Sequence, residues 1–311
     1  DLDASDLPDS LDGLVAQFGR SIPAGVGRER GPDLRGATAH AVESRAYQWL
    51  FDHRTPRVED SRRLGTALNQ LGTLGSGNHF IEVCLDERDR VWVVLHSGSR
   101  GVGNQLANAH IKLAKAQHQA LEDPDLSYFV EGTQPFTDYI QDMLWSQAYA
   151  FENREIMMVV ALADLFNAVG KGHQVDRINC HHNFSQREVH GGVECWITRK
   201  GAIKASVGQR GVIPGSMGAK SYIVEGLGNP LSYESAAHGA GRRLSRRAAK
   251  RELTEESLIE AMRGKAWNQD AKALLDEHPQ AYKPIDEVMA AQADLVSIVH
   301  TLHQVANYKG V

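Results

Sequence analysis

Apolar residues recur at helical spacing in several stretches of this chain. In residues 6–19 they fall three or four positions apart, at Leu7, Leu11, Leu14, Val15 and Phe18. This spacing predicts a short amphipathic helix, followed by a Gly- and Arg-rich surface loop over 24–38. Similar patterns predict a helix over about 41–50 and two long helices over about 104–121 and 136–168. The C-terminal third is expected to be mostly helical, with its last helical pattern over 285–305.

Two pairs of β-prone runs predict hairpins. Residues 81–85 and 91–95 are joined by five polar residues, and His79 and His96 stand at their outer ends. Residues at the open end of an antiparallel pair lie close together, so these two imidazoles are placed to share a metal ion. A second hairpin is expected where 178–189 and 193–198 flank two glycines, with His182 on its first strand. A mixed α/β (α+β) fold follows, expected as one domain over 1–311 with hairpins and sheets around a central cleft and helices outside.

Composition narrows the class of protein. Hydrophobic residues make up 42% of the chain and charged residues 23%, and no apolar run approaches the roughly 18 residues that span a bilayer. These values are typical of a soluble globular protein with no membrane partner. Three cysteines without a CxxC spacing favour a reduced, cytoplasmic location. The net charge of −5 means that a nucleic acid would need a local basic patch, and residues 242–251 supply one.

Four of the fourteen histidines have small or amide neighbours that permit close approach of a ligand: His79, His96, His182 and His238. A lone histidine is more often a hydrogen-bonded core or surface residue, and most of the others are interpreted in that way. His181 either supports a metal ligand or only packs against His182. Imidazole suits Zn, Mn, Fe or Ni about equally, whereas phosphate chemistry favours Mn or Mg.

The run His238-Gly239-Ala240-Gly241-Arg242 pairs a candidate nucleophile with a candidate phosphate site. Glycines let a phosphate approach the backbone, and a helix expected just after the run would offer free N–H groups to the same phosphate. Residues 215–221 are also rich in small and hydroxyl residues, as in anion-binding turns. Without a Walker spacing, however, a structural turn is the default interpretation of that segment.

An ordered set of motifs resembles the RtcB RNA ligases. The set includes Gly77-Asn78-His79-Phe80-Ile81-Glu82, His96-Ser97-Gly98-Ser99-Arg100-Gly101, His182-Asn183, Arg199-Lys200-Gly201-Ala202, Pro214-Gly215-Ser216-Met217-Gly218, His238-Gly239-Ala240-Gly241-Arg242 and Lys309-Gly310. The resemblance runs from about residue 1 to residue 310. It implies a ligase that joins RNA 3′-phosphate or 2′,3′-cyclic phosphate ends to 5′-hydroxyl ends, in tRNA splicing or RNA repair, with GTP and Mn²⁺. It does not identify an activating protein partner.

The same resemblance implies roles for individual residues. His238 would attack the α-phosphate of GTP to give a histidine–GMP adduct, the GMP would pass to the RNA 3′-phosphate, and the 5′-hydroxyl would displace it. Manganese ligands would be His79, His96 and His182. The residues implied around GMP are Asn78, Glu82, Asn183, Ser216, Ser221, Ala240, Tyr282 and Lys309, with Arg242 and Arg243 near phosphates. Glu82 can accept from guanine N1 and N2, and Lys309 can donate to O6, which selects G over A.

One motif of the family is expected upstream of residue 1. An Asp-x-Gly-Cys-Gly type segment supplies a carboxylate and a thiolate to the two manganese ions of the family, so the domain is expected to be incomplete at its N-terminus. Two alternatives therefore stay open. One is a non-catalytic RNA-binding or regulatory relative that lacks a complete dimetal site. The other is a metal-dependent phosphohydrolase, which would need neither Glu82, Lys309 nor a nucleophilic His238.

Overall fold

The computed structural model describes residues 1–311 except 28, 30–36, 119–120 and 311. Most of the predicted 24–38 loop therefore lies outside the described residues. The helices of the described part are α1 (Asp12–Ser21), α2 (Ala37–Asp52), α3 (Ser61–Gln70), α4 (Arg100–Gln117), α5 (Gln134–Val169), α6 (Arg246–Glu252), α7 (Glu255–Ala261), α8 (Ala271–Leu274) and α9 (Ile285–Ala290). None of the described helices is long and apolar enough to cross a membrane.

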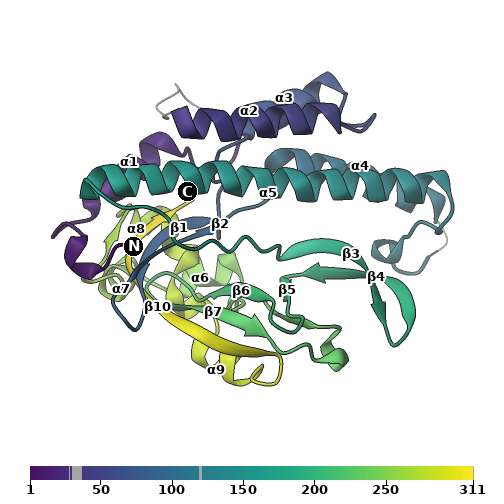
Figure 1. The fold of residues 1–311 in the computed structure, drawn as a ribbon. Helices are drawn as coiled ribbons and strands as arrows, with labels where there is room; N and C mark the ends of the chain where they lie inside the picture. Colours follow the sequence, from purple (N-terminus) through teal and green to yellow (C-terminus); the bar gives the residue numbers. More distant parts are fainter. Residues whose placement is uncertain (28, 30–36, 119–120, 311) are drawn as a thin grey trace.

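A curved antiparallel sheet lies beneath helices α1 to α5 in the view of Figure 1. Its strands run in the order β2 (Val91–His96), β1 (Phe80–Leu85), β10 (Val296–Lys309), β7 (Lys220–Gly226) and β6 (Arg210–Pro214), and β9 (Ala266–Trp267) pairs in parallel with β10. The remaining strands form two small ladders, β3 (Asn183–His190) with β4 (Val193–Lys200), and β5 (Ala202–Lys204) with β8 (Ser235–Ala237). The mixed α/β class predicted from the sequence is confirmed.

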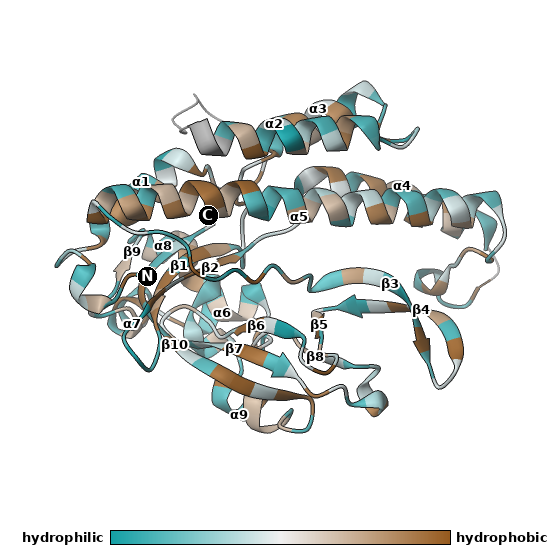
Figure 2. Cartoon of the chain, viewed as in Figure 1, coloured by the Kyte–Doolittle hydropathy of each residue, from teal (hydrophilic) through white to brown (hydrophobic). Residues whose placement is uncertain are grey.

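The helix predicted over 285–305 is wrong. Only Ile285–Ala290 is helical, and Val296–Lys309 forms β10, the central strand of the sheet. One half of β10 pairs with β7 and the other half with β1. The segment is rich in β-branched residues, and the ladder bonds on both sides outweigh its apolar spacing, which also fits a helix. Figure 2 shows hydrophobic stretches along the strands of this sheet, β10 included.

The long helix α5 joins two hydrophobic cores. Near its C-terminal end Met157, Val160 and Leu165 pack with α1 and the sheet. Nearer its N-terminus Trp145 and Tyr149 pack with α2, α3 and α4. Thr133 caps the start of α5, and Gly170 ends it in the left-handed conformation, so both ends follow the expected capping chemistry.

Other sequence predictions are confirmed with shifted boundaries. Both hairpins are present, and the two long helices differ from their predicted ranges by at most four residues at either end. His182 lies just before β3 and not on it, which corrects the prediction. The first helix starts at Asp12 rather than at residue 6, after a separate 3-10 turn over Ala4–Asp6. The helix expected just after His238 begins only at Arg246, because Ser245 supplies its N-cap.

Candidate functional site

The histidines singled out from the sequence meet at one place. The ring of His96, at the end of β2, has its centroid 5.7 Å from that of His79, 4.4 Å from His182 and 5.9 Å from His238. The rings of His182 and His238 stack at 5.2 Å and 9°. Ladder pairing explains the first contact, because Phe80, next to His79, is directly opposite His96 across β1 and β2. The prediction that His79 and His96 converge at the open end of this hairpin is confirmed.

Glycines let the backbone approach two of these rings. Gly75 has a φ of +102°, and a Cβ there would lie 2.3 Å from His79 Nδ1. Gly201 has a φ of +67°, and a Cβ there would lie 3.3 Å from the His238 ring. Asn183 Oδ1 accepts from the Gly201 N–H at 2.8 Å, and the Gly201 carbonyl accepts from the His238 N–H at 3.3 Å. A side chain at position 75 would therefore displace His79, and one at position 201 would be strained by the positive φ and tight against the His238 ring.

The cluster is uncharged at neutral pH. Burial, followed by the charge of Arg100, lowers the pKa of His79 to about 4. Burial and the neighbouring histidines lower the pKa of His182 to about 3 and that of His96 well below its usual value. Burial also lowers the pKa of His238, against an opposing backbone hydrogen bond to Gly201. Neutral imidazoles are the form that binds metal ions and attacks electrophiles.

The chemistry of these side chains fits a divalent metal. His79 Nδ1 contacts the Leu74 carbonyl at 2.8 Å, an arrangement that leaves Nε2 for a metal, as is usual for ligating histidines. The ligand atoms of the three predicted ligands do not all lie within 4.8 Å of one another, so binding one ion would require them to draw together. Among the described residues the trio that meets this distance is Asp86, Glu87 and His300. There Asp86 Oδ2 already accepts from Arg90 and Trp92.

A cluster of buried polar side chains lies near Phe80. The Phe80 ring stacks on His96 at 5.5 Å, and Lys309 Nζ lies 5.1 Å from the same ring. In this cluster Glu82 is 2% exposed, and its Oε1 accepts from Asn307 Nδ2 at 2.8 Å. Glu82 Oε2, Asn307 Oδ1 and Ser221 Oγ are buried without a hydrogen-bond partner. Buried polar atoms without partners are costly, so this group is a candidate site for a polar ligand.

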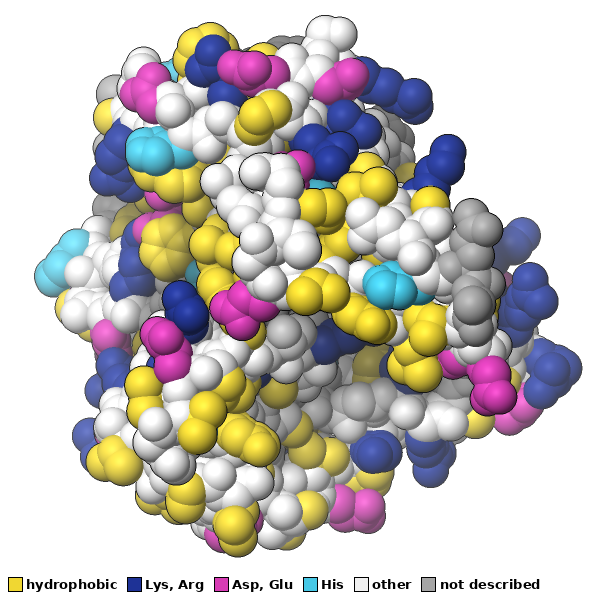
Figure 3. All heavy atoms as spheres, turned by 90° about the vertical axis from the view of Figure 1, so that its right-hand side faces the viewer, with side chains coloured by type: hydrophobic (Ala, Val, Ile, Leu, Met, Phe, Trp, Pro, Cys, Tyr) yellow, Lys and Arg dark blue, Asp and Glu magenta, His cyan; other side chains and the backbone are white. Residues whose placement is uncertain are grey.

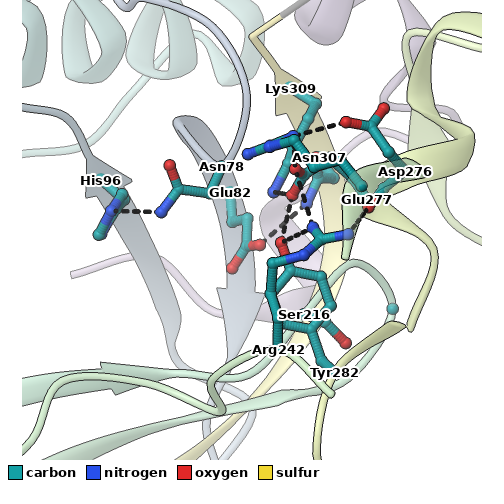
Figure 4. Close-up of polar contacts among 12 residues, drawn as sticks. Asn78, Glu82, His96, Ser216, Arg242, Asp276, Glu277, Tyr282, Asn307 and Lys309 are labelled. Atoms are coloured by element: carbon teal, nitrogen blue, oxygen red, sulfur yellow. Dashed lines mark hydrogen bonds and ion pairs between the residues drawn. The ribbon is translucent and has the colours of Figure 1, made fainter. Parts of the chain in front are cut away.

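Lys309, Tyr282 and Arg242 come together around Glu277 (Figure 4). Lys309 Nζ lies 3.3 Å from Glu277 Oε2, and Tyr282 Oη donates to the same oxygen at 2.5 Å. Arg242 Nη1 donates to Tyr282 Oη at 3.1 Å, and Arg242 Nη2 donates to the Asp276 carbonyl at 2.6 Å. Arg242 Nε donates to the Leu244 carbonyl at 3.1 Å, so every nitrogen of this guanidinium has a protein partner. Arg243 Nε donates to the Gln280 carbonyl at 2.8 Å, which leaves its terminal nitrogens available.

The other predicted nucleotide residues take two positions. Asn78 lies beside the histidines, with Nδ2 3.3 Å from His96 Nε2, and Asn183 supports Gly201 next to His238. Ser216 lies in the β6–β7 turn, where its carbonyl accepts from Gln304, and Ala240 is buried with its N–H on the Pro214 carbonyl. In that turn the N–H groups of Gly215, Gly218 and Ala219 are bonded within the protein, in agreement with a structural turn.

Sequence reasoning missed the carboxylates and the amides that organise this part of the site. Asp276 and Glu277 form the end of a 3-10 turn over Leu275–Glu277, and they bind cations 30 or more residues away in the chain. Asn307 and Gln304 lie on β10; Gln304 falls within the helix predicted over 285–305, and Asn307 lies just beyond it. No regular spacing in the sequence marks these residues, since the buried Gln304 and Lys309 lie five positions apart on the strand.

The basic stretch forms α6 and its approach. Arg246 Nη1 contacts Asp276 Oδ2 and Glu277 Oε1, each at 2.6 Å, and Lys250 Nζ lies 3.4 Å from Asp276 Oδ1. Arg247 is exposed and takes part in none of these contacts. Elsewhere, Figure 3 shows a hollow on the face near the β3–β4 hairpin, with Lys and Arg side chains at its edge. Cations are therefore exposed on α6 and on that face of a chain whose net charge is negative.

Known proteins resemble this chain over nearly its whole length. The family described as tRNA-splicing ligase RtcB matches residues 1–310. The RNA-splicing ligase RtcB of Escherichia coli strain K12 is 44% identical over 328 residues, which cover 99% of this chain and 79% of the relative. The RNA-splicing ligase RtcB of Mycobacterium tuberculosis strain H37Rv is 30% identical, covering 93% and 80%. The tRNA-splicing ligase RtcB of Nanoarchaeum equitans is 28% identical, covering 99% and 78%.

Proposed function

Since this chain belongs to the RtcB family of RNA-splicing ligases, we propose that it joins RNA 3′-phosphate or 2′,3′-cyclic phosphate ends to 5′-hydroxyl ends with GTP and Mn²⁺. The observation that carries the proposal is the meeting of four neutral histidines near a cluster of buried polar side chains, three of whose atoms lack hydrogen-bond partners. The direct test is ligation of such RNA ends by the purified chain. Failure with GTP and Mn²⁺ both present would contradict it.

His238 is the proposed nucleophile. A lone pair of its neutral imidazole attacks the α-phosphorus of GTP, the bond to the β-phosphate oxygen breaks, and pyrophosphate leaves. The GMP then moves from the ring nitrogen to the RNA 3′-phosphate, and the RNA 5′-hydroxyl displaces it. The Asn183 side chain holds the Gly201 N–H, and the Gly201 carbonyl holds the His238 N–H, so these bonds fix the backbone position from which the imidazole attacks.

His79, His96 and His182 are the proposed manganese ligands. Bound Mn²⁺ would polarise the phosphates and offset the charge that develops on them. Metal binding requires neutral imidazoles, and burial already keeps these three ligands neutral by lowering their pKa values. We also propose a cytoplasmic location. The described cysteines are free thiols, which is usual in a reducing compartment.

Guanine is proposed to bind at the cluster of Glu82, Ser221, Asn307 and Lys309. An ionised Glu82 accepts from guanine N1 and N2, while Lys309 Nζ donates to O6. Adenine presents an amino group in place of O6 and lacks the N1 proton, so the same groups reject it. The partnerless Glu82 Oε2 and Ser221 Oγ support this assignment, because a base edge would satisfy them.

We expect GTP affinity to rise with pH. Burial raises the pKa of Glu82 to about 8, although Lys309 opposes the shift. Guanine needs the ionised carboxylate, so below pH 8 binding expels a proton and affinity falls by up to about tenfold per pH unit. The pKa values of His79 and His182, about 4 and about 3, lie below this range. Calorimetric titration with GTP at pH 6, 7 and 8 measures the slope. The variant Glu82→Gln should lose it, and an equal slope in both proteins would remove Glu82 from guanine recognition.

Helix α6 is proposed to contact the RNA backbone. Loss of one phosphate contact makes the slope of log affinity against log salt concentration less steep by about 0.7 for single-stranded RNA. We expect Arg247→Gln to weaken RNA binding by this signature without blocking guanylylation. Arg246→Gln should weaken RNA binding as well, but it also removes contacts to Asp276 and Glu277, so Arg247 gives the cleaner test.

Binding to a fluorescent RNA across a salt series checks this expectation. The matched control is Arg263→Gln, since Arg263 is an exposed arginine just beyond α7 that pairs with Glu260. A salt slope in Arg247→Gln equal to that of the unmodified protein would take α6 out of the RNA path.

A further inference from the structure

Glu277 is the most heavily shared carboxylate of the site. Its side chain is 2% exposed. Its Oε1 accepts from Arg246 Nη1 at 2.6 Å and lies 3.4 Å from Arg242 Nη1. Its Oε2 accepts from Tyr282 Oη at 2.5 Å and lies 3.3 Å from Lys309 Nζ. One buried carboxylate therefore orients four side chains. Lys309 belongs to the proposed guanine site, and Tyr282 is one of the residues that the family resemblance implies around GMP.

Glu277 controls the Lys309 ammonium without controlling the Lys309 backbone. The backbone is held by Asn268, whose Oδ1 accepts from the Lys309 N–H at 3.2 Å and whose Nδ2 donates to the Lys309 carbonyl at 3.1 Å. It is also held by the pairing of Lys309 with Phe80 across β10 and β1. Loss of the Glu277 charge would therefore free the ammonium while the strand stays in place.

Asp276, its neighbour in the chain, has a different set of partners. The Asp276 side chain contacts Arg246 and Lys250 of α6. None of the contacts found for its carboxylate among the described residues involves Lys309 or Tyr282. The two adjacent carboxylates thus have different partners. Asp276 contacts the basic helix α6, whereas Glu277 contacts both that helix and Lys309 of the proposed base site (Figure 4).

We propose that Glu277 is a positioning residue for nucleotide selection, because it fixes Lys309 Nζ and Tyr282 Oη for contact with the guanine edge. The inference rests on the proposed GTP-dependent function. A lysine ammonium on a flexible four-carbon stem gives selectivity only when it is held in one position. Glu277 supplies that hold with a full charge from within the protein, where such contacts are strongest.

The test compares GTP with ATP in formation of the covalent nucleotide adduct. In Glu277→Gln the ratio of kcat/KM for GTP to that for ATP should fall about tenfold, with KM for GTP raised, as expected for loss of a charged hydrogen bond. Glu277→Asp keeps the charge and should give an intermediate ratio. Glu260→Gln removes an exposed carboxylate that pairs with Arg263, and it should leave the ratio unchanged.

An unchanged ratio of kcat/KM for GTP to that for ATP in folded Glu277→Gln, with or without equal losses for both nucleotides, would overturn the proposal. Folding is checked by circular dichroism and thermal melting. If Glu277→Gln does not fold, Glu277→Asp carries the test alone, and a ratio equal to that of the unmodified protein overturns it. Absence of an adduct in the unmodified protein would instead reject the GTP-dependent function on which the inference rests.

Discussion

Replacing His238 by Ala is expected to abolish both the GMP adduct and RNA ligation, with a loss of at least about a thousandfold in rate. The imidazole is the only part of the residue that can hold the nucleotide, so the covalent route has no substitute. The fold should survive, because the bond from the residue 238 N–H to the Gly201 carbonyl belongs to the backbone. The adduct is measured with radiolabelled GTP, by counting the label bound to the protein before and after acid treatment. Ligation is measured in a gel assay.

The control for His238→Ala is His53→Ala. His53 lies on the surface after α2 and stacks on Trp49, far along the chain from the cluster. That variant should retain both activities. Ligation preserved in His238→Ala would reject the covalent mechanism and direct attention to another nucleophile.

Replacing His96 by Ala is expected to lower Mn²⁺ affinity about a hundredfold or more, since loss of even a supporting partner costs ten- to a hundredfold. His96 is the centre of the cluster, because its ring lies within 5.9 Å of the other three. Calorimetric titration with Mn²⁺ in the absence of GTP and RNA measures the affinity directly, independently of catalysis. Phe80 would lose its stacking partner, so thermal melting of the variant is needed beside the titration.

His53→Ala again serves as the matched histidine control for metal binding. Its Mn²⁺ affinity should equal that of the unmodified protein. If His96→Ala bound Mn²⁺ with the same affinity and stoichiometry, the three-histidine site would be wrong, whatever the activity of the variant.

The sequence predicted the parts of this site that depend on local pairing. The first hairpin needs only two β-prone runs and a polar turn, and its antiparallel register alone brings His79 beside His96. Local pairing was therefore sufficient to bring His79 and His96 together, but not to place His182 and His238 beside them.

The proposed base site could not be predicted in the same way. Its wall is β10, whose Leu302 and Ala306 also fit a helical period, and only pairing with two distant strands decides between strand and helix. Glu277 lies in a short turn and meets Lys309 through the tertiary fold. No spacing in the sequence marks such a contact, because it joins segments that secondary structure alone does not bring together.

The central claim is that His238 carries GMP. Intact mass of the purified protein, before and after incubation with GTP and Mn²⁺, tests it most directly. The account predicts a gain equal to one GMP per chain, labile to acid and mapping to the peptide that contains His238. An unchanged mass, or an adduct on a peptide without His238, would contradict it.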